Sequence, residues 1–150
     1  MVENKLEDAI AFAVAVHKGQ KDKAGELYIL HPLRVMIKMD SETEKIVAVL
    51  HDVVEDSVAS IETLRSIGFP EEVLKAVDCI SQRDGEFYSD YLKRVGTNSI
   101  ARKVKVADLE DNMNIMRLST LGEKDLKRLN KYLTEWKTLI YIVRMKENTL

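Results

Sequence analysis

A histidine and an aspartate stand side by side at positions 51 and 52, directly after the apolar residues 46–50. An apolar helix is expected to lie in the core, where an unpaired carboxylate is strongly destabilising. Adjacent helical side chains project about 100° apart, so His51 and Asp52 can converge on a point between them. A structural ion pair or a capped helix end would also account for the dipeptide alone. The apolar setting and the acids that follow favour a metal ion.

Two further acids, Glu55 and Asp56, follow on the same helix, which is predicted over about residues 41–56. Residues four apart share a helix face, so Glu55 lies on the face of His51 and Asp56 on that of Asp52. The helix is therefore predicted to present one layer of histidine and aspartate, followed by a second layer of two acids.

The other two histidines lie in earlier segments. His31 precedes Pro32 at the predicted start of a helix, where it is either a turn residue or a ligand. His17 lies on the apolar stripe of the first predicted helix and is expected to be a core residue, with a role near the site as the alternative. His31 is thus the second candidate imidazole ligand.

A second acidic candidate, Asp108, follows an apolar run and shares a helix face with Asn112. A solvated acidic face is expected for Glu110 and Asp111, but the apolar neighbours of Asp108 argue against it there. A site of two imidazoles and two carboxylates suits Mn²⁺, Fe²⁺ or Zn²⁺ better than Ca²⁺. Such a metal would lower the pKa of bound water and polarise a phosphoryl group.

Glycines and prolines separate the segments with helical periodicity. Ser41 with Glu44 predicts a capping box, Ser60 with Thr63 predicts a similar start, and Gly68 predicts a helix end. No segment alternates with the period of a strand. The sequence therefore predicts an all-α fold of about seven or eight helices, over about residues 4–18, 32–39, 41–56, 60–67, 70–80, 87–95, 98–118 and from 123 onward.

The composition restricts the class of protein. The chain has 150 residues, 45% of them hydrophobic and 32% charged, with a net charge of -2, so one folded domain is expected and a nucleic-acid binder is not. The single cysteine, Cys79, excludes an internal disulfide or a thiolate metal cluster. The lack of a membrane-length apolar run and of a secretory signal predicts a cytoplasmic protein without a membrane partner. A homo-oligomer is compatible with the sequence.

The order His31, then His51-Asp52, then Asp108 resembles the HD superfamily of metal-dependent phosphohydrolases. The contexts of these residues are similar to the hydrolase branch of the RelA/SpoT family, which removes the 3′-pyrophosphate from guanosine tetra- and pentaphosphate, (p)ppGpp, and uses Mn²⁺. The resemblance covers about residues 6–118. It implies a single HD-domain helical bundle over residues 1–150, with a C-terminal helix over about 123–145.

The resemblance also implies a role for each matching position. Glu55 and Asp56 match the acidic pair that positions or activates the attacking water. The implied metal ligands are His31, His51, Asp52 and Asp108, and the implied nucleotide contacts are Lys23, Tyr28, Asn112 and, as a weaker match, Arg83.

Two positions depart from the family pattern. Asp22 and Leu109 stand where the family has basic residues, and both are expected to border the cleft. Lys23 and Arg83 would then be its main cations, so a phosphatase or phosphodiesterase acting on a less charged nucleotide is the first alternative to a (p)ppGpp hydrolase. Changing both positions to basic residues is predicted to improve hydrolysis of ppGpp. A non-enzymatic domain that binds a nucleotide or a protein is the second alternative.

Overall fold

The computed structural model describes residues 5–149, and this part of the chain is helical, without a strand. The fold class predicted from the sequence, an all-α bundle of seven or eight helices, is therefore confirmed. The elements in order are α1 (Lys5–Val16), α2 (Leu30–Ile37), α3 (Glu42–Leu50), α4 (Ile61–Ile67), α5 (Glu71–Ile80), α6 (Tyr88–Thr97), α7 (Ser99–Asn112), the 3₁₀ turn η1 (Ile115–Arg117) and α8 (Glu123–Glu147).

Local sequence signals set several helix ends. The Ser41 side chain accepts a hydrogen bond from the backbone N–H of Glu44, and the Glu44 side chain accepts one from that of Ser41, as a capping box requires. Ser60 and Thr63 form the same arrangement at the start of α4. Gly68 ends α4 with a φ of +92°, a left-handed conformation that glycine adopts without strain. These predicted boundaries are confirmed.

Helix α3 ends earlier than the sequence predicts. It stops at Leu50, and residues 51–55 form turns, so His51 and Asp52 lie at the end of the helix and not in its middle. The ring Nδ1 of His51 lies 2.6 Å from the Ala48 carbonyl oxygen, which a continuing helix would pair with the N–H of Asp52. The predicted helix over 98–118 is also shorter, because α7 ends at Asn112 and η1 follows.

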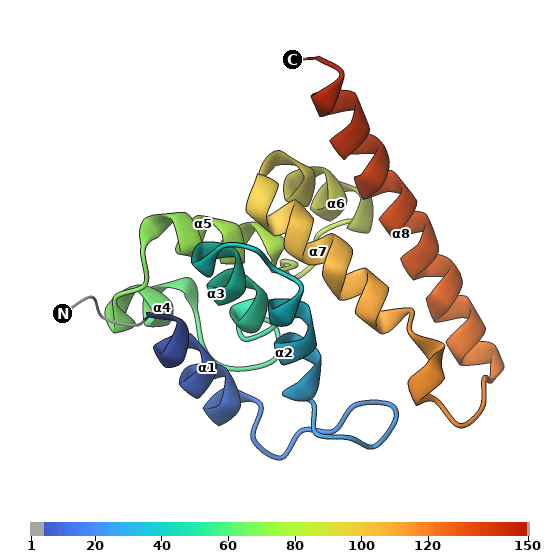
Figure 1. Ribbon diagram of the computed structural model, residues 1–150, viewed down its shortest axis with the longest axis horizontal. Helices are drawn as coiled ribbons and strands as arrows, with labels where there is room; N and C mark the ends of the chain where they lie inside the picture. Colours follow the sequence, from blue (N-terminus) through green and yellow to red (C-terminus); the bar gives the residue numbers. More distant parts are fainter. Residues whose placement is uncertain (1–4, 150) are drawn as a thin grey trace.

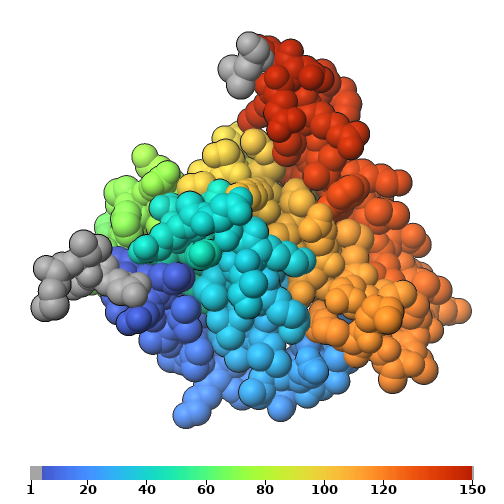
Figure 2. Space-filling view, in the orientation of Figure 1, coloured from blue at the N-terminus to red at the C-terminus, as the bar shows by residue number. Residues whose placement is uncertain are grey.

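Helix α3 occupies the centre of the bundle. It packs against α1, α2, α5 and α7, and all of residues 46–50 are buried. Helix α8 packs along α7 and α6 on one side, and its C-terminal end extends beyond the rest of the molecule (Figures 1 and 2). In residues 5–149, no helix has the length and apolar character needed to cross a membrane. The packing of α2, α3 and α7 brings three distant segments to one place.

Candidate metal centre and adjoining cavity

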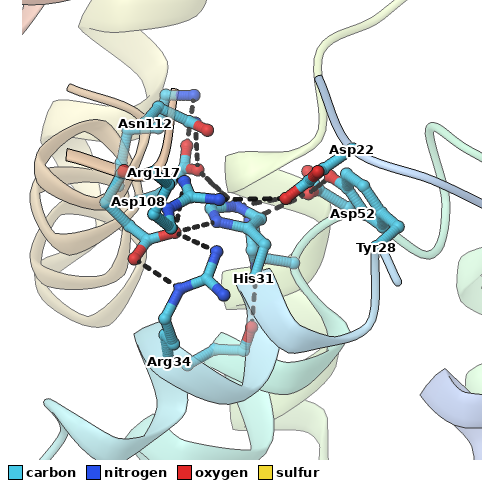
Figure 3. Close-up of polar contacts among 12 residues, drawn as sticks. Asp22, Tyr28, His31, Arg34, Asp52, Asp108, Asn112 and Arg117 are labelled. Atoms are coloured by element: carbon cyan, nitrogen blue, oxygen red, sulfur yellow. Dashed lines mark hydrogen bonds and ion pairs between the residues drawn. The ribbon is translucent and has the colours of Figure 1, made fainter. Parts of the chain in front are cut away.

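Three helices deliver the candidate ligands to one buried point. His31 lies in the first turn of α2, His51 and Asp52 follow the end of α3, and Asp108 lies in α7 (Figure 3). One ligand atom from each of His31, His51 and Asp108 lies within 4.8 Å of the others. Asp52 extends this group, since its Oδ2 is 3.0 Å from Nε2 of His51 and 3.8 Å from Nε2 of His31. The structure thus brings together the four residues predicted as ligands.

The two histidines present the correct nitrogen to a metal. Nδ1 of His31 faces Oδ2 of Asp111 at 2.6 Å, and Nδ1 of His51 faces the Ala48 carbonyl oxygen, so both Nδ1 atoms are donors. Each Nε2 is buried beside carboxylate oxygens and has no hydrogen-bond partner in residues 5–149. In the neutral ring, that atom carries a free lone pair. The donor set therefore fits a divalent metal bound by N and O atoms.

The electrostatics of the cluster also favour a bound cation. Burial lowers the pKa of His31, but the carboxylates of Asp108 and Asp111 outweigh it and raise this pKa above its ordinary value. Burial raises the pKa of Asp108, but Lys105 and the two histidines lower it well below its usual range. Asp108 is therefore ionised, and the carboxylates around the two imidazoles favour a positive charge at this point.

Asp111 was expected on a solvated face, and this prediction is wrong. It is 3% exposed, and its carboxylate accepts hydrogen bonds from His31 and from Arg34, whose Nε and Nη2 lie 2.9 and 3.0 Å from Oδ1 and Oδ2. A carboxylate behind a ligating histidine fixes the orientation of the ring. The signal was present in the sequence, because Asp111 lies three residues after Asp108 and so shares its helix face.

Further side chains hold the carboxylate ligands. Asp108 Oδ2 lies 2.8 Å from Lys105 Nζ, and its Oδ1 accepts a hydrogen bond of 2.8 Å from Asn112. The hydroxyl of Tyr28 donates to Oδ2 of Asp52. Asn112 and Tyr28, which the sequence assigns to the nucleotide, therefore also contact the candidate ligands.

The two acids assigned to water, Glu55 and Asp56, lie in the turns after α3 and line the same cavity as the cluster. The carboxylate of Glu55 accepts a hydrogen bond from the backbone N–H of Gln82. Burial is the main reason that the pKa of Glu55 is raised, and the same holds for Asp56, where the charge of Asp52 adds to it. A raised carboxyl pKa makes either group a stronger base.

A cavity of about 380 Å³ opens over the cluster. Its wall includes Tyr28, Asn112 and Tyr132 together with the cations Lys21, Lys23, Lys105, Arg117 and Arg128. The sequence identified only Lys23 among these cations as a cleft residue. Arg117 in η1 and Arg128 in α8 come from segments outside the recognisable motifs, which is why they were missed.

Four other residues singled out in the sequence fall in different places. Leu109 is fully buried in the core, so the expectation that it borders the cleft is wrong. Asp22 does line the cavity, but it pairs with Arg117 at 2.9 Å. Arg83 lines a neighbouring groove and pairs with Asp78 at 3.2 Å. His17 is 2% exposed, as expected of a core residue, and its ring packs on Tyr28.

Sequence comparison connects this site to characterised proteins. The chain is 32% identical over 138 residues to guanosine-3′,5′-bis(diphosphate) 3′-pyrophosphohydrolase of Aquifex aeolicus, covering 85% of this chain and 20% of that protein. It is 32% identical over 112 residues to the bifunctional (p)ppGpp synthase/hydrolase SpoT of Escherichia coli K12, covering 71% and 15%. Over most of its length the chain is therefore similar to one region of these two proteins. No family model matches it.

The similarity to RelA/SpoT-type proteins is confined to one region of them, because the chain spans about a fifth or less of the length of these curated relatives. A solved structure described as a metazoan ortholog of SpoT that hydrolyses ppGpp superposes with a TM-score of 0.75 and 24% identity. The match covers 93% of this chain and 85% of the other. It shows that the two chains share their helical fold.

Proposed function

We propose that this protein is a metal-dependent hydrolase that releases pyrophosphate from the 3′ position of (p)ppGpp. The observation that carries the proposal is the buried His/Asp cluster, with its free Nε2 atoms, at the floor of a cavity lined by five basic side chains. The names of the Aquifex aeolicus and Escherichia coli relatives support the choice of substrate. Mn²⁺ is the proposed metal, with Fe²⁺ and Zn²⁺ as alternatives.

In the proposed mechanism, Glu55 with Asp56 orients a water molecule and accepts its proton. The water oxygen attacks the phosphorus bonded to the ribose 3′ oxygen. The bond between that phosphorus and the 3′ oxygen breaks, and the 3′ oxygen takes up a proton to become the ribose hydroxyl. GDP or GTP and pyrophosphate are the products. His31, His51, Asp52 and Asp108 would hold the metal, which would supply positive charge and lower the pKa of water.

The basic side chains of the cavity support one of the candidate substrates over the other. A tetra- or pentaphosphorylated nucleotide has several negative charges, and Lys21, Lys23 and Arg128, which also pairs with Asp125, offer positive charge on the cavity wall. The alternative of a less charged nucleotide rests on Asp22 and Leu109. Leu109 is in the core, and the charge of Asp22 is balanced by Arg117. These contacts favour the more anionic substrate.

The test is pyrophosphate release from ppGpp by the purified chain with added Mn²⁺, beside a panel of guanine and adenine mono- and diphosphates. We expect kcat/KM to be highest for ppGpp and activity to be lost with a chelator. A higher kcat/KM for a mononucleotide would favour the phosphatase or phosphodiesterase alternative. Metal binding without hydrolysis of any nucleotide would favour the non-enzymatic domain.

A further inference from the structure

Arg117 contacts two parts of the site that are far apart in the sequence. Its Nη1 donates to Oδ2 of Asp22 at 2.9 Å, across 95 residues of chain. Its Nη2 donates to the backbone carbonyl oxygen of Asp111 at 3.2 Å and lies 3.6 Å from Oδ2 of the same residue. Figure 3 shows Arg117 beside His31, with the dashed line to Asp22. One guanidinium therefore bridges the loop before α2 and the end of α7.

On the loop side, Asp22 organises the turn that carries two of the cavity's lysines. Its Oδ1 accepts hydrogen bonds of 2.9 Å from the backbone N–H groups of both Ala24 and Glu26. Its backbone N–H donates to the Glu26 carbonyl oxygen at 2.9 Å. Lys21 and Lys23 flank Asp22 and line the cavity. Oδ1 is thus used within the loop, and Oδ2 is the atom that reaches Arg117.

On the metal side, Asp111 is the carboxylate that fixes His31. Arg34 donates hydrogen bonds to both oxygens of Asp111, and its charge also acts on Asp22 and Glu26, but no hydrogen bond or ion pair joins it to loop 20–26 within residues 5–149. Arg117 is therefore the residue that contacts both Asp111 and Asp22. The side chains of Asp111, Asp22 and Arg117 are only 4%, 12% and 23% exposed, so water screens these pairs less than it screens surface ion pairs.

We propose that Arg117 is a positioning residue that ties the lysine-bearing loop 20–26 to the carboxylate behind His31. These contacts of Arg117 with Asp22 and Asp111, which we call the Arg117 bridge, hold the loop with its lysines at a fixed position relative to the candidate metal centre. The role in substrate binding rests on the proposed function, whereas the roles in loop order and metal affinity do not.

The direction in which one substitution changes KM separates this positioning role from a purely electrostatic role of Asp22. Asp22→Asn keeps an Oδ1 acceptor for Ala24 and Glu26 and removes the negative charge that faces Arg117. If Asp22 only repelled phosphate, its neutralisation would lower KM for ppGpp. If Asp22 positions Arg117 and the loop, KM rises by several fold. The two readings predict opposite directions for the same variant.

Three variants divide the bridge into its parts. Arg117→Met removes the contacts with both Asp22 and Asp111, and Asp22→Asn weakens only the contact with the loop. Arg34→Met removes two hydrogen bonds to Asp111 and no hydrogen bond to the loop. Each is compared with wild type for its Mn²⁺ dissociation constant by calorimetry, for KM and kcat with ppGpp at saturating Mn²⁺, and for amide hydrogen exchange in residues 20–26. Arg117→Lys, which keeps the charge but not the forked geometry, serves as the conservative variant.

We expect Arg34→Met to raise the Mn²⁺ dissociation constant by about tenfold, in the range seen for groups that support metal ligands, with little change in loop exchange. Asp22→Asn should raise KM and speed loop exchange without changing Mn²⁺ affinity. Arg117→Met should raise the Mn²⁺ dissociation constant, raise KM and speed loop exchange. Arg117→Lys should show the same changes to a smaller extent. Adding Asp22→Asn to Arg117→Met should not raise KM further.

The proposal is overturned if Arg117→Met changes only the Mn²⁺ dissociation constant, or only KM and loop exchange. It is also overturned if Asp22→Asn lowers KM, or if the effects of the two substitutions on KM multiply. If wild type does not hydrolyse ppGpp, the proposed function fails. In that case the Mn²⁺ affinity and the loop exchange of Arg117→Met still decide the bridge, since neither measurement needs turnover.

Discussion

The two sides of the cavity are built in different ways. The metal side consists of buried and half-buried groups on α2, on α7 and in the turns after α3, and these three helices pack against one another in the core. The nucleotide side consists of the loop 20–26, η1 and the first turns of α8, with more exposed side chains that meet across long stretches of chain. The first side has its geometry fixed by core packing. The second depends on a few polar contacts, such as that of Arg117 with Asp22.

The largest expected effect comes from the metal side. Asp52→Ala removes a candidate ligand and leaves His51 without its nearest carboxylate, so metal binding and turnover should both fall to background. Elemental analysis should find close to one transition-metal ion per wild-type chain and none in the variant. A wild-type protein that holds no metal after loading with Mn²⁺ would contradict the assignment of this centre.

Chelation offers a check on the same centre that does not need a variant. Removing the metal leaves four titratable groups facing one another without their cation, and this should lower Tm. Asp78→Ala is a matched control for Asp52→Ala, because Asp78 is an exposed acid that pairs with Arg83 outside the cavity. This control should retain the metal and respond to the chelator as wild type does.

A smaller loss should follow when the acid beside the metal is changed. Glu55→Gln keeps the size of the side chain but cannot accept the proton of water, so kcat should fall by roughly 10²–10⁴-fold. Metal content and KM should stay near those of wild type, because Glu55 is assigned to the water. Loss of metal from this variant, measured by elemental analysis, would instead make Glu55 a ligand.

The metal side could be predicted because its signals are local. His51-Asp52 and Asp108 are polar residues in apolar runs, and such residues need a partner when they are buried. Besides the early end of α3, the errors on this side are errors of one helical step. Leu109 lies about 100° around the helix from Asp108 and enters the core, whereas Asp111 returns to the face of Asp108.

The nucleotide side could not be predicted in the same way. The contact of Arg117 with Asp22 spans 95 residues, and Arg128 reaches the cavity only because α8 packs back along α7. Neither arginine stands in a pattern that indicates burial or a ligand. In the sequence, Asp22 suggested a lost cation, but the structure pairs it with a cation from η1.

A loss of intermediate size should follow when a basic residue of the nucleotide side is removed. Arg128 lines the cavity from α8, where its Nη2 donates to Oδ1 of Asp125 at 2.8 Å. Arg128→Met should raise KM for ppGpp by about ten- to hundredfold, as expected when a charge-assisted hydrogen bond to phosphate is lost. Mn²⁺ affinity should not change. Lys127→Met, which changes a neighbouring lysine absent from the cavity wall, is the matched control, and an equal effect of both would contradict a specific contact.

The smallest expected effect is a pH dependence confined to the nucleotide side. Burial is the main cause that lowers the pKa of Lys23, and the positive charge of Arg128 lowers it further. A lowered pKa means that Lys23 loses its proton at a less alkaline pH than an ordinary lysine does. KM for ppGpp should therefore rise as the pH rises through this range. Bound phosphate opposes the loss of the proton, so the pKa of Lys23 should be higher in the substrate complex, and KM should level off above that pKa.

Lys23→Arg separates this effect from other alkaline changes, because arginine keeps its charge throughout the range. The variant should show a flat KM at alkaline pH, while Lys18→Arg, a substitution outside the cavity wall, should behave as wild type does. If KM of Lys23→Arg still rises with pH, the titrating group lies elsewhere. If KM of wild type is flat, the charge of Lys23 does not contribute to nucleotide binding, and Arg128 with Lys21 would carry the electrostatic attraction on this side.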